Sequence, residues 1–144
     1  MARVTTYLNF MGQSEEAFTF YRDLFGGEFI GPILRIGDMA PMPGGPQLSE
    51  DDLRKVMHME VSILDGHVLM ATDLLESMGH ELKIGNNTTI NLEPDTREET
   101  ERIFNALCEG GSDIAPLADM PWGAYWGCVL DRFGVRWMFN YSAS

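Results

Sequence analysis

Thr88 to Gly110, TTINLEPDTREETERIFNALCEG, repeats the stretch TTYLNFMGQSEEAFTFYRDLFGG from Thr5 to Gly27 at a displacement of 83 residues. Each copy opens with a β-rich run, continues as an amphipathic helix and ends at glycine. The apolar helix positions match as well, at i, i+3, i+4 and i+7, and are Ala17, Phe20, Tyr21 and Leu24 in one copy and Thr100, Ile103, Phe104 and Leu107 in the other. This agreement indicates a duplicated structural unit.

Each predicted helix is followed by three strand-like runs, so both halves predict a β-α-β-β-β unit. In the first half the strands are expected at 4–10, 28–36, 55–64 and 67–72, with a hairpin signal at Asp65-Gly66. In the 55–64 strand, alternation places Met57, Met59, Val61 and Ile63 on one face and His58, Glu60 and Ser62 on the other. In the second half the strands follow Gly111, lead into Val129 and close the chain at 135–141.

These units define the expected domain organisation. The first module covers residues 1–75, a polar linker covers 76–87, and the second module covers 88–144. The two modules form either one compact domain or a pair exchanged within a dimer. Between the second and third strands of the first module, Gly37 to Gln47 is rich in proline and glycine, and we interpret it either as a surface connection or as a lid.

Local signals mark the helix ends. Ser14 is the expected N-cap of the first helix, and Gly26-Gly27 ends it. Thr96 and Glu99 form a capping-box pair for the second helix, and Ser49 precedes an acidic run that indicates a short helical turn.

Composition excludes several classes of function. The formal net charge of −12, without a basic run, argues against nucleic acid as a partner. No apolar run approaches the length of a membrane span, so we expect a cytoplasmic protein that does not enter membranes. Cys108 and Cys128 lack metal or redox spacing and are expected to be two buried, reduced thiols.

The chain resembles the vicinal-oxygen-chelate superfamily of glyoxalases, bleomycin-resistance proteins and dioxygenases, and within it the PhnB-like branch labelled 3-demethylubiquinone methyltransferase-like. The residues that carry the resemblance are Tyr7-Leu8-x-Phe10, Ala17-Phe18-x-Phe20-Tyr21, Phe25-Gly26-Gly27, Gly37-Asp38-Met39, His58, Leu69-Met70-Ala71-x-Asp73, Trp122-Gly123 with Gly127, and Asp131-x-Phe133-Gly134-Val135-x-Trp137-Met138-x-Asn140. It implies an α+β fold of two tandem β-α-β-β-β modules, with cupped mixed sheets, helices on the outer face, a ligand cavity on the other face, and a homodimer. No glycine-rich adenosyl-methionine loop follows a strand, so the methyltransferase label itself carries little weight.

The resemblance also implies where a metal would bind. Metal enzymes of the superfamily take ligands from the first and last strands of each module, and these positions correspond here to Thr6, Met70, Thr89 and Met138. Hydroxyl and thioether groups are poor ligands for divalent cations, which prefer imidazole or carboxylate in such sites. We therefore predict no metal and no cofactor at the conventional site.

The predicted function is the binding of a small organic ligand, with no reaction specified. The expected cavity residues are Thr6, Leu8, Phe10, His58, Met70, Thr89, Asn91, Trp122, Trp126, Arg136, Met138 and Asn140. For the two tryptophans a place in the core is the alternative, and for Arg136 a surface ion pair. The cavity is expected to be apolar on the side of Leu8 and Phe10 and polar on the side of Asn91 and Glu93.

Two other functions stay open. His58 and Glu60 share a strand face, and Glu93 ends the comparable face of the second module, so an off-pattern metal or acid/base site is conceivable. That set would make the protein a metal-dependent lyase, isomerase or dioxygenase. A structural dimer with a vestigial cup is the other possibility.

Overall fold

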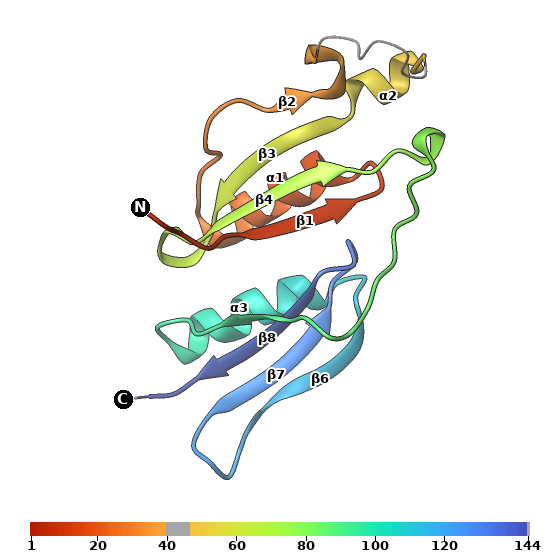
Figure 1. Ribbon diagram of the computed structural model, residues 1–144. Helices are drawn as coiled ribbons and strands as arrows, with labels where there is room; N and C mark the ends of the chain where they lie inside the picture. The colour runs from red at the N-terminus through yellow and green to blue at the C-terminus, as the bar shows by residue number, and fades with distance from the viewer. Residues whose placement is uncertain (40–46, 144) are drawn as a thin grey trace. The chain divides into compact units, whose positions relative to one another are not determined.

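The computed structural model describes residues 1–39 and 47–143, which form two compact units, Met1–Lys83 and Ile84–Ser144. Each unit contains a four-stranded mixed sheet with a helix lying across one face (Figure 1). Most of the expected Gly37–Gln47 loop, residues 40–46, lies outside the described residues, and so does any lid that it would form.

The first unit follows the predicted element order. Its strands are β1 (Thr6–Phe10), β2 (Leu34–Arg35), β3 (Val56–Ser62) and β4 (Val68–Asp73), and its helices are α1 (Ser14–Phe25) and the short α2 (Glu50–Arg54). The sheet order is β1-β4-β3-β2, in which β1 runs parallel to β4 and the other pairs are antiparallel.

The second unit repeats this plan. It contains β5 (Ile90–Leu92), α3 (Arg97–Cys108), β6 (Ser112–Asp119), β7 (Tyr125–Leu130) and β8 (Arg136–Tyr141). The sheet order is β5-β8-β7-β6, and again the first strand is parallel to the last. The fold is therefore α+β with two tandem β-α-β-β-β modules, as predicted.

The cores lie between each sheet and its helix. In the first unit Phe10 packs edge-on against Phe18 of α1, and both side chains are fully buried. In the second unit Phe104 of α3 meets Phe139 edge-on beside the buried Trp137. Burying one such side chain stabilises the folded state by about 1.5–3 kcal/mol, so these aromatic contacts fix each helix on its sheet.

The predicted helix faces are mostly confirmed. All four residues predicted for the second helix are buried, and so are Ala17, Tyr21 and Leu24 of the first. Phe20 is only half-buried, and Phe18 takes the central place under α1 instead.

Two strand predictions are corrected by irregular backbone. The strand expected at 28–36 is reduced to Leu34–Arg35 and an isolated bridge between Phe29 and Val61, because Gly31 has a positive φ and Pro32 has no amide hydrogen to donate. In β3, the pairing with β2 shifts by one residue next to Met57, and this side chain is exposed rather than aligned with the buried Met59.

Turn and cap chemistry explains the chain reversals. Asp65 and Gly66 both have positive φ, as the hairpin signal predicts. Gly26 ends α1 in the left-handed conformation, and Gly27 follows because a β-carbon there would meet the carbonyl oxygen of Ser62 at 1.8 Å. Thr96 caps α3 by accepting a hydrogen bond from the amide of Glu99.

The start of α1 differs from the prediction. Ser14 is the first helical residue rather than the cap, and its amide and hydroxyl both donate to Oδ1 of Asp73, at 3.0 and 2.7 Å. The other carboxylate oxygen of Asp73 accepts from the amide of Val56 at 2.9 Å. One buried carboxylate at the end of β4 thus holds the beginnings of α1 and β3.

We expect Asp73→Asn to lower the free energy of unfolding by about 2 kcal/mol, because hydrogen bonds to a charged acceptor are strong and an amide cannot accept on both sides. Urea denaturation measures the change. Asp51→Asn is the control, since its side chain is 73% exposed and its loss should cost less than about 0.5 kcal/mol. Equal stability of the two variants would contradict the role given to Asp73.

Both cysteines are free thiols, as predicted, but they are half-buried rather than buried. Burial raises the pKa of the Cys108 thiol above its usual 9.0, which lowers its thiolate fraction near neutral pH.

In a Cys128→Ser variant, Cys108 should react several times more slowly with Ellman's reagent at pH 8 when the protein is folded than when it is unfolded in urea. Equal rates would show that the thiol is not shielded.

No helix in the described part of the chain is long and apolar enough to span a membrane.

Candidate functional site

Each sheet has one face covered by its helix and one face turned away from it, which we call the open face. Strand register identifies the residues on each face, because directly paired residues point the same way. On the first sheet, Tyr7 pairs with Met70 and Met70 pairs with Glu60. These side chains alternate with the buried Leu69 and Ala71 of the core, so they lie on the open face.

The register of β1 is one residue away from the expected one. Thr6, Leu8 and Phe10 pair with Leu69, Ala71 and Asp73, all of them buried on the helix side. Phe10 belongs to the core under α1, and Leu8 shares its face. Tyr7 and Asn9 occupy the open face in their place.

Tyr7 joins the two residues that the sequence singled out in β3. Its hydroxyl lies 3.1 Å from Nδ1 of His58, and Nε2 of His58 lies 2.9 Å from Oε2 of Glu60. Burial raises the pKa of Tyr7 above its usual 10.0, and the Glu60 carboxylate acts in the same direction, while a hydrogen bond with Thr72 lowers it. The phenol is consequently protonated at neutral pH.

Several of the expected cavity residues share the open face of the second sheet. Asn91 pairs with Met138, and Trp126 pairs with Asn140. Asn140 donates through Nδ2 to Oδ1 of Asn91 at 2.7 Å, and Asn91 donates to Glu93 at 2.8 Å. These side chains form a polar row beside the half-buried Trp126.

The remaining expected cavity residues lie as follows. Thr89 immediately precedes β5 and is half-buried. Trp122 stands at the β6–β7 turn and is 69% exposed, and no strand pairing places it on the open face. Arg136 contacts Asp113 at 3.3 Å and the carbonyl of Gly85, an arrangement that corresponds to the ion-pair alternative.

Three of the four positions expected from the metal enzymes make side-chain contacts within the protein. Met70 accepts a hydrogen bond from the Thr5 hydroxyl at 3.6 Å, and the Thr6 hydroxyl lies 3.0 Å from Nε2 of His67. Met138 accepts one from Asn140 at 3.5 Å. Across residues 1–39 and 47–143, no three His, Cys, Asp or Glu side chains come together in a metal-binding group.

The three candidate catalytic residues are divided between the two units. His58 and Glu60 are in contact within the first unit, whereas Glu93 belongs to the second unit and contacts Asn91. Sequence reasoning missed Tyr7. The signal was available, since Leu8 and Phe10 are apolar and Tyr7 and Asn9 are polar, a pattern typical of a strand whose apolar side faces the core.

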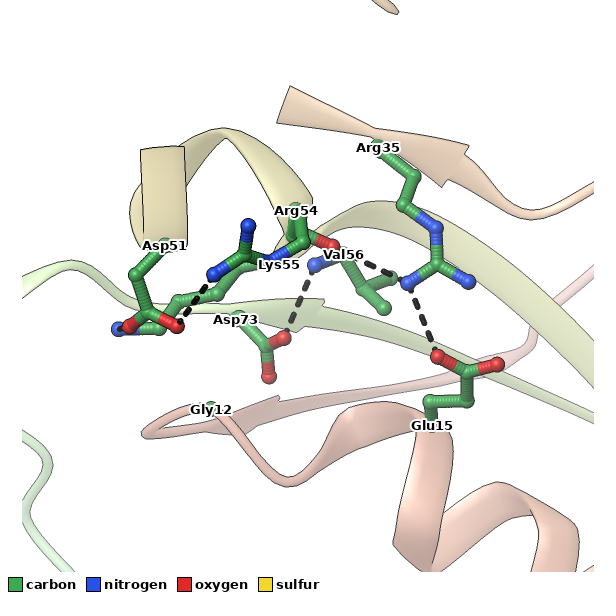
Figure 2. Close-up of a pocket in the computed structure, with 8 residues that line it drawn as sticks. All are labelled: Gly12, Glu15, Arg35, Asp51, Arg54, Lys55, Val56 and Asp73. Atoms are coloured by element: carbon green, nitrogen blue, oxygen red, sulfur yellow. Dashed lines mark hydrogen bonds and ion pairs between the residues drawn. The ribbon is translucent and has the colours of Figure 1, made fainter. Parts of the chain in front are cut away.

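A separate hollow of about 340 Å³ lies where α2 meets the first sheet (Figure 2). Glu15 accepts from Arg35 at 2.9 Å, and this bond raises the pKa of the guanidinium. Lys55 pairs with Asp52 at 3.3 Å, and Asp73 binds the backbone as described above. These charged side chains already have partners on the protein. Their contacts hold α2 and the start of β3 in place.

Comparisons with known proteins agree with this architecture. A family model described as 3-demethylubiquinone-9 3-methyltransferase matches residues 2–139. The crystal structure of protein PA1353 from Pseudomonas aeruginosa is 33% identical, with all of both chains covered and a TM-score of 0.81. A putative 3-demethylubiquinone-9 3-methyltransferase, PhnB protein, from Bacillus cereus is 27% identical, with 98% of this chain and 100% of that chain covered and a TM-score of 0.77.

More distant structures share the fold alone. A glyoxylase/bleomycin resistance protein/dioxygenase domain from Frankia sp. EAN1pec has a TM-score of 0.63 at 8% identity, with 100% of this chain and 94% of that chain covered. The family match spans nearly the whole chain, and the tandem modules share the fold of the glyoxylase/bleomycin resistance protein/dioxygenase domain. The chain therefore belongs to the family described as 3-demethylubiquinone-9 3-methyltransferase, which includes the PhnB-like proteins.

Proposed function

We propose that the protein binds a small organic molecule on the open faces of its sheets, without a conventional divalent-metal site. The observation that carries the proposal is the hydrogen-bonded Tyr7–His58–Glu60 chain on the sheet face opposite α1. A face that only completed the core would be apolar, whereas a ligand site combines apolar walls with a few converging polar groups. Met70 supplies apolar surface next to this chain.

The second sheet supports the same function. Trp126 and Met138 offer aromatic and thioether surface, and Asn91 and Asn140 offer amide donors and acceptors between them. Both amides are engaged with one another, so a ligand would exchange partners with groups that are already oriented.

The metal-dependent alternative uses His58, Glu60 and Glu93. Its support is the contact between His58 and Glu60, since an imidazole held by a carboxylate is also typical of a metal ligand with its supporting group. Methyl transfer has less support, because the turn after β1 is Met11-Gly12-Gln13 and carries a single glycine.

We further propose a cytoplasmic homodimer. Ile30, Leu34 and Met57 are each about two-fifths exposed around the short edge strand β2, and exposed apolar surface at a sheet edge favours association. Light scattering should give a dimer mass, and Leu34→Lys should shift the protein toward a monomer, while Val4→Lys, at an exposed N-terminal position, should leave the mass unchanged. A monomer mass for the unmodified chain would contradict the proposal.

Ligand binding is tested by thermal denaturation with a panel of small aromatic and oxygenated compounds. A ligand at 100 times its Kd adds about 2.7 kcal/mol of stability, which raises the Tm by several degrees. Tyr7→Phe and Asn140→Ala should reduce the shift.

The matched controls make the same two kinds of substitution at positions away from the open faces. Tyr125→Phe removes a hydroxyl that contacts Glu101 of α3, and Asn105→Ala changes an exposed position of the same helix, so both should retain the shift. Stoichiometric Zn, Ni, Mn or Fe in the purified protein, lost in His58→Ala, would overturn the metal-free proposal in favour of the alternative.

A further inference from the structure

Tyr7, His58 and Glu60 form one continuous hydrogen-bonded chain across two strands. The phenol and imidazole rings are tilted at 43° with centroids 5.7 Å apart, and each ring nitrogen of His58 has one partner. The side chains of Glu60 and His58 are 21% and 29% exposed, whereas Tyr7 is 48% exposed. The chain therefore runs from a half-buried carboxylate to a phenol that is open to solvent.

The order of donors along the chain follows from the chemistry of its inner end. An ionised carboxylate only accepts hydrogen bonds, so Nε2 of His58 carries the proton that is shared with Glu60. In a neutral imidazole Nδ1 is then an acceptor, and it accepts a hydrogen bond from the hydroxyl of Tyr7. Of the two remaining lone pairs on the Tyr7 oxygen, Thr72 engages one, and the other can accept a proton from a ligand.

The surroundings of His58 leave Glu60 as the charged group that acts on it. Tyr7 comes from β1, the facing β4 residues are Met70 and Thr72, and the paired residue of β2 is Leu34. None of these β2 and β4 side chains is charged, and the Glu60 carboxylate is the charged group hydrogen-bonded to His58.

We propose that Glu60, His58 and Tyr7 act as a proton relay whose outer end exchanges a proton with an acidic hydroxyl of the bound molecule, a phenol or an enol. This rests on the proposed ligand-binding function and assigns its chemical class. The ligand O–H bond breaks as its proton passes to Oη of Tyr7, while the original proton of Tyr7 passes to Nδ1 of His58. The products are a ligand oxyanion and an imidazolium paired with Glu60, and no electrons are transferred.

The reverse direction returns the proton. The imidazolium donates from Nδ1 to Oη of Tyr7, and Tyr7 donates its own proton to the oxyanion. In this scheme Tyr7 contacts the ligand, His58 holds the transferred proton, and Glu60 positions His58 and balances its charge. The raised pKa of Tyr7 supports this role, because a phenol that stays protonated is a donor to an oxyanion at neutral pH.

Internal comparison places the relay in one module only. The register equivalents of Tyr7, His58 and Glu60 on the second sheet are Asn91, Trp126 and Cys128. This set cannot carry a proton between a carboxylate and a phenol. The relay is therefore not a by-product of the duplicated scaffold, which forms the same sheet without it.

The probe for the relay is 4-nitrophenol, because its ionised form absorbs visible light and reports its own protonation state. Near the pKa of the free probe, binding to the wild-type protein should change the absorbance, and Tyr7→Phe should weaken binding about tenfold and abolish the change. His58→Gln should keep binding within about threefold but remove the pH dependence of the absorbance change. Tyr125→Phe, the matched control, should behave like the wild type.

Three outcomes would overturn the relay. One is an unchanged absorbance response in Tyr7→Phe. Another is failure of the wild-type protein to bind the probe while other compounds raise its Tm, which rejects the phenol class but leaves ligand binding intact. The third needs no ligand: ¹⁵N NMR of His58 should show the Nε2–H tautomer, lost in Glu60→Gln, and an Nδ1–H tautomer would exclude the donor order on which the relay depends.

Discussion

The first module depends on the buried carboxylate of Asp73. A carboxylate with 6% exposure is costly unless its lone pairs are satisfied, and three donors from Ser14 and Val56 satisfy it. Because these donors come from α1 and β3 while Asp73 ends β4, the carboxylate fixes three elements at one point. It also holds Asp73 on the helix side of the sheet. Because side chains alternate along a strand, Met70 and Thr72 then point to the open face.

A one-residue offset between helix and strand explains why the internal repeat misled the assignment of faces. The helices are displaced by 83 residues, from Ser14 to Arg97, but the strand register relates Tyr7 to Asn91, a displacement of 84. Since side chains alternate along a strand, one residue is enough to exchange the two faces. Thr6 and Thr89 match in the sequence, yet Thr6 lies on the helix side of its sheet, and the register equivalent of Thr89 is Thr5.

Short-range signals predicted most of the fold. The period of α3, the Asp65-Gly66 turn and the Thr96 cap each depend on neighbouring residues, and the structure confirms all three. Features that depend on distant partners were not predictable in this way. The sequence predicts Ser14 as a helix cap, whereas the hydrogen bonds that it donates go to Asp73, 59 residues away. The exposed Met57 likewise depends on how β2 pairs with β3.

The candidate site also has a part that neighbouring residues predict and a part that depends on a distant strand. Alternation within β3 was enough to place His58 and Glu60 together, but the partner that completes the chain comes from β1, 51 residues earlier. The helix-side faces of both sheets must be filled with apolar volume, as by Leu69 and Trp137 at equivalent positions, because the modules would not otherwise fold. The open faces carry no such demand and differ in chemistry, with the phenol–imidazole–carboxylate chain in one module and the paired amides of Asn91 and Asn140 in the other. A duplicated fold can change function on that face without losing stability, so the first open face is where a reaction would arise.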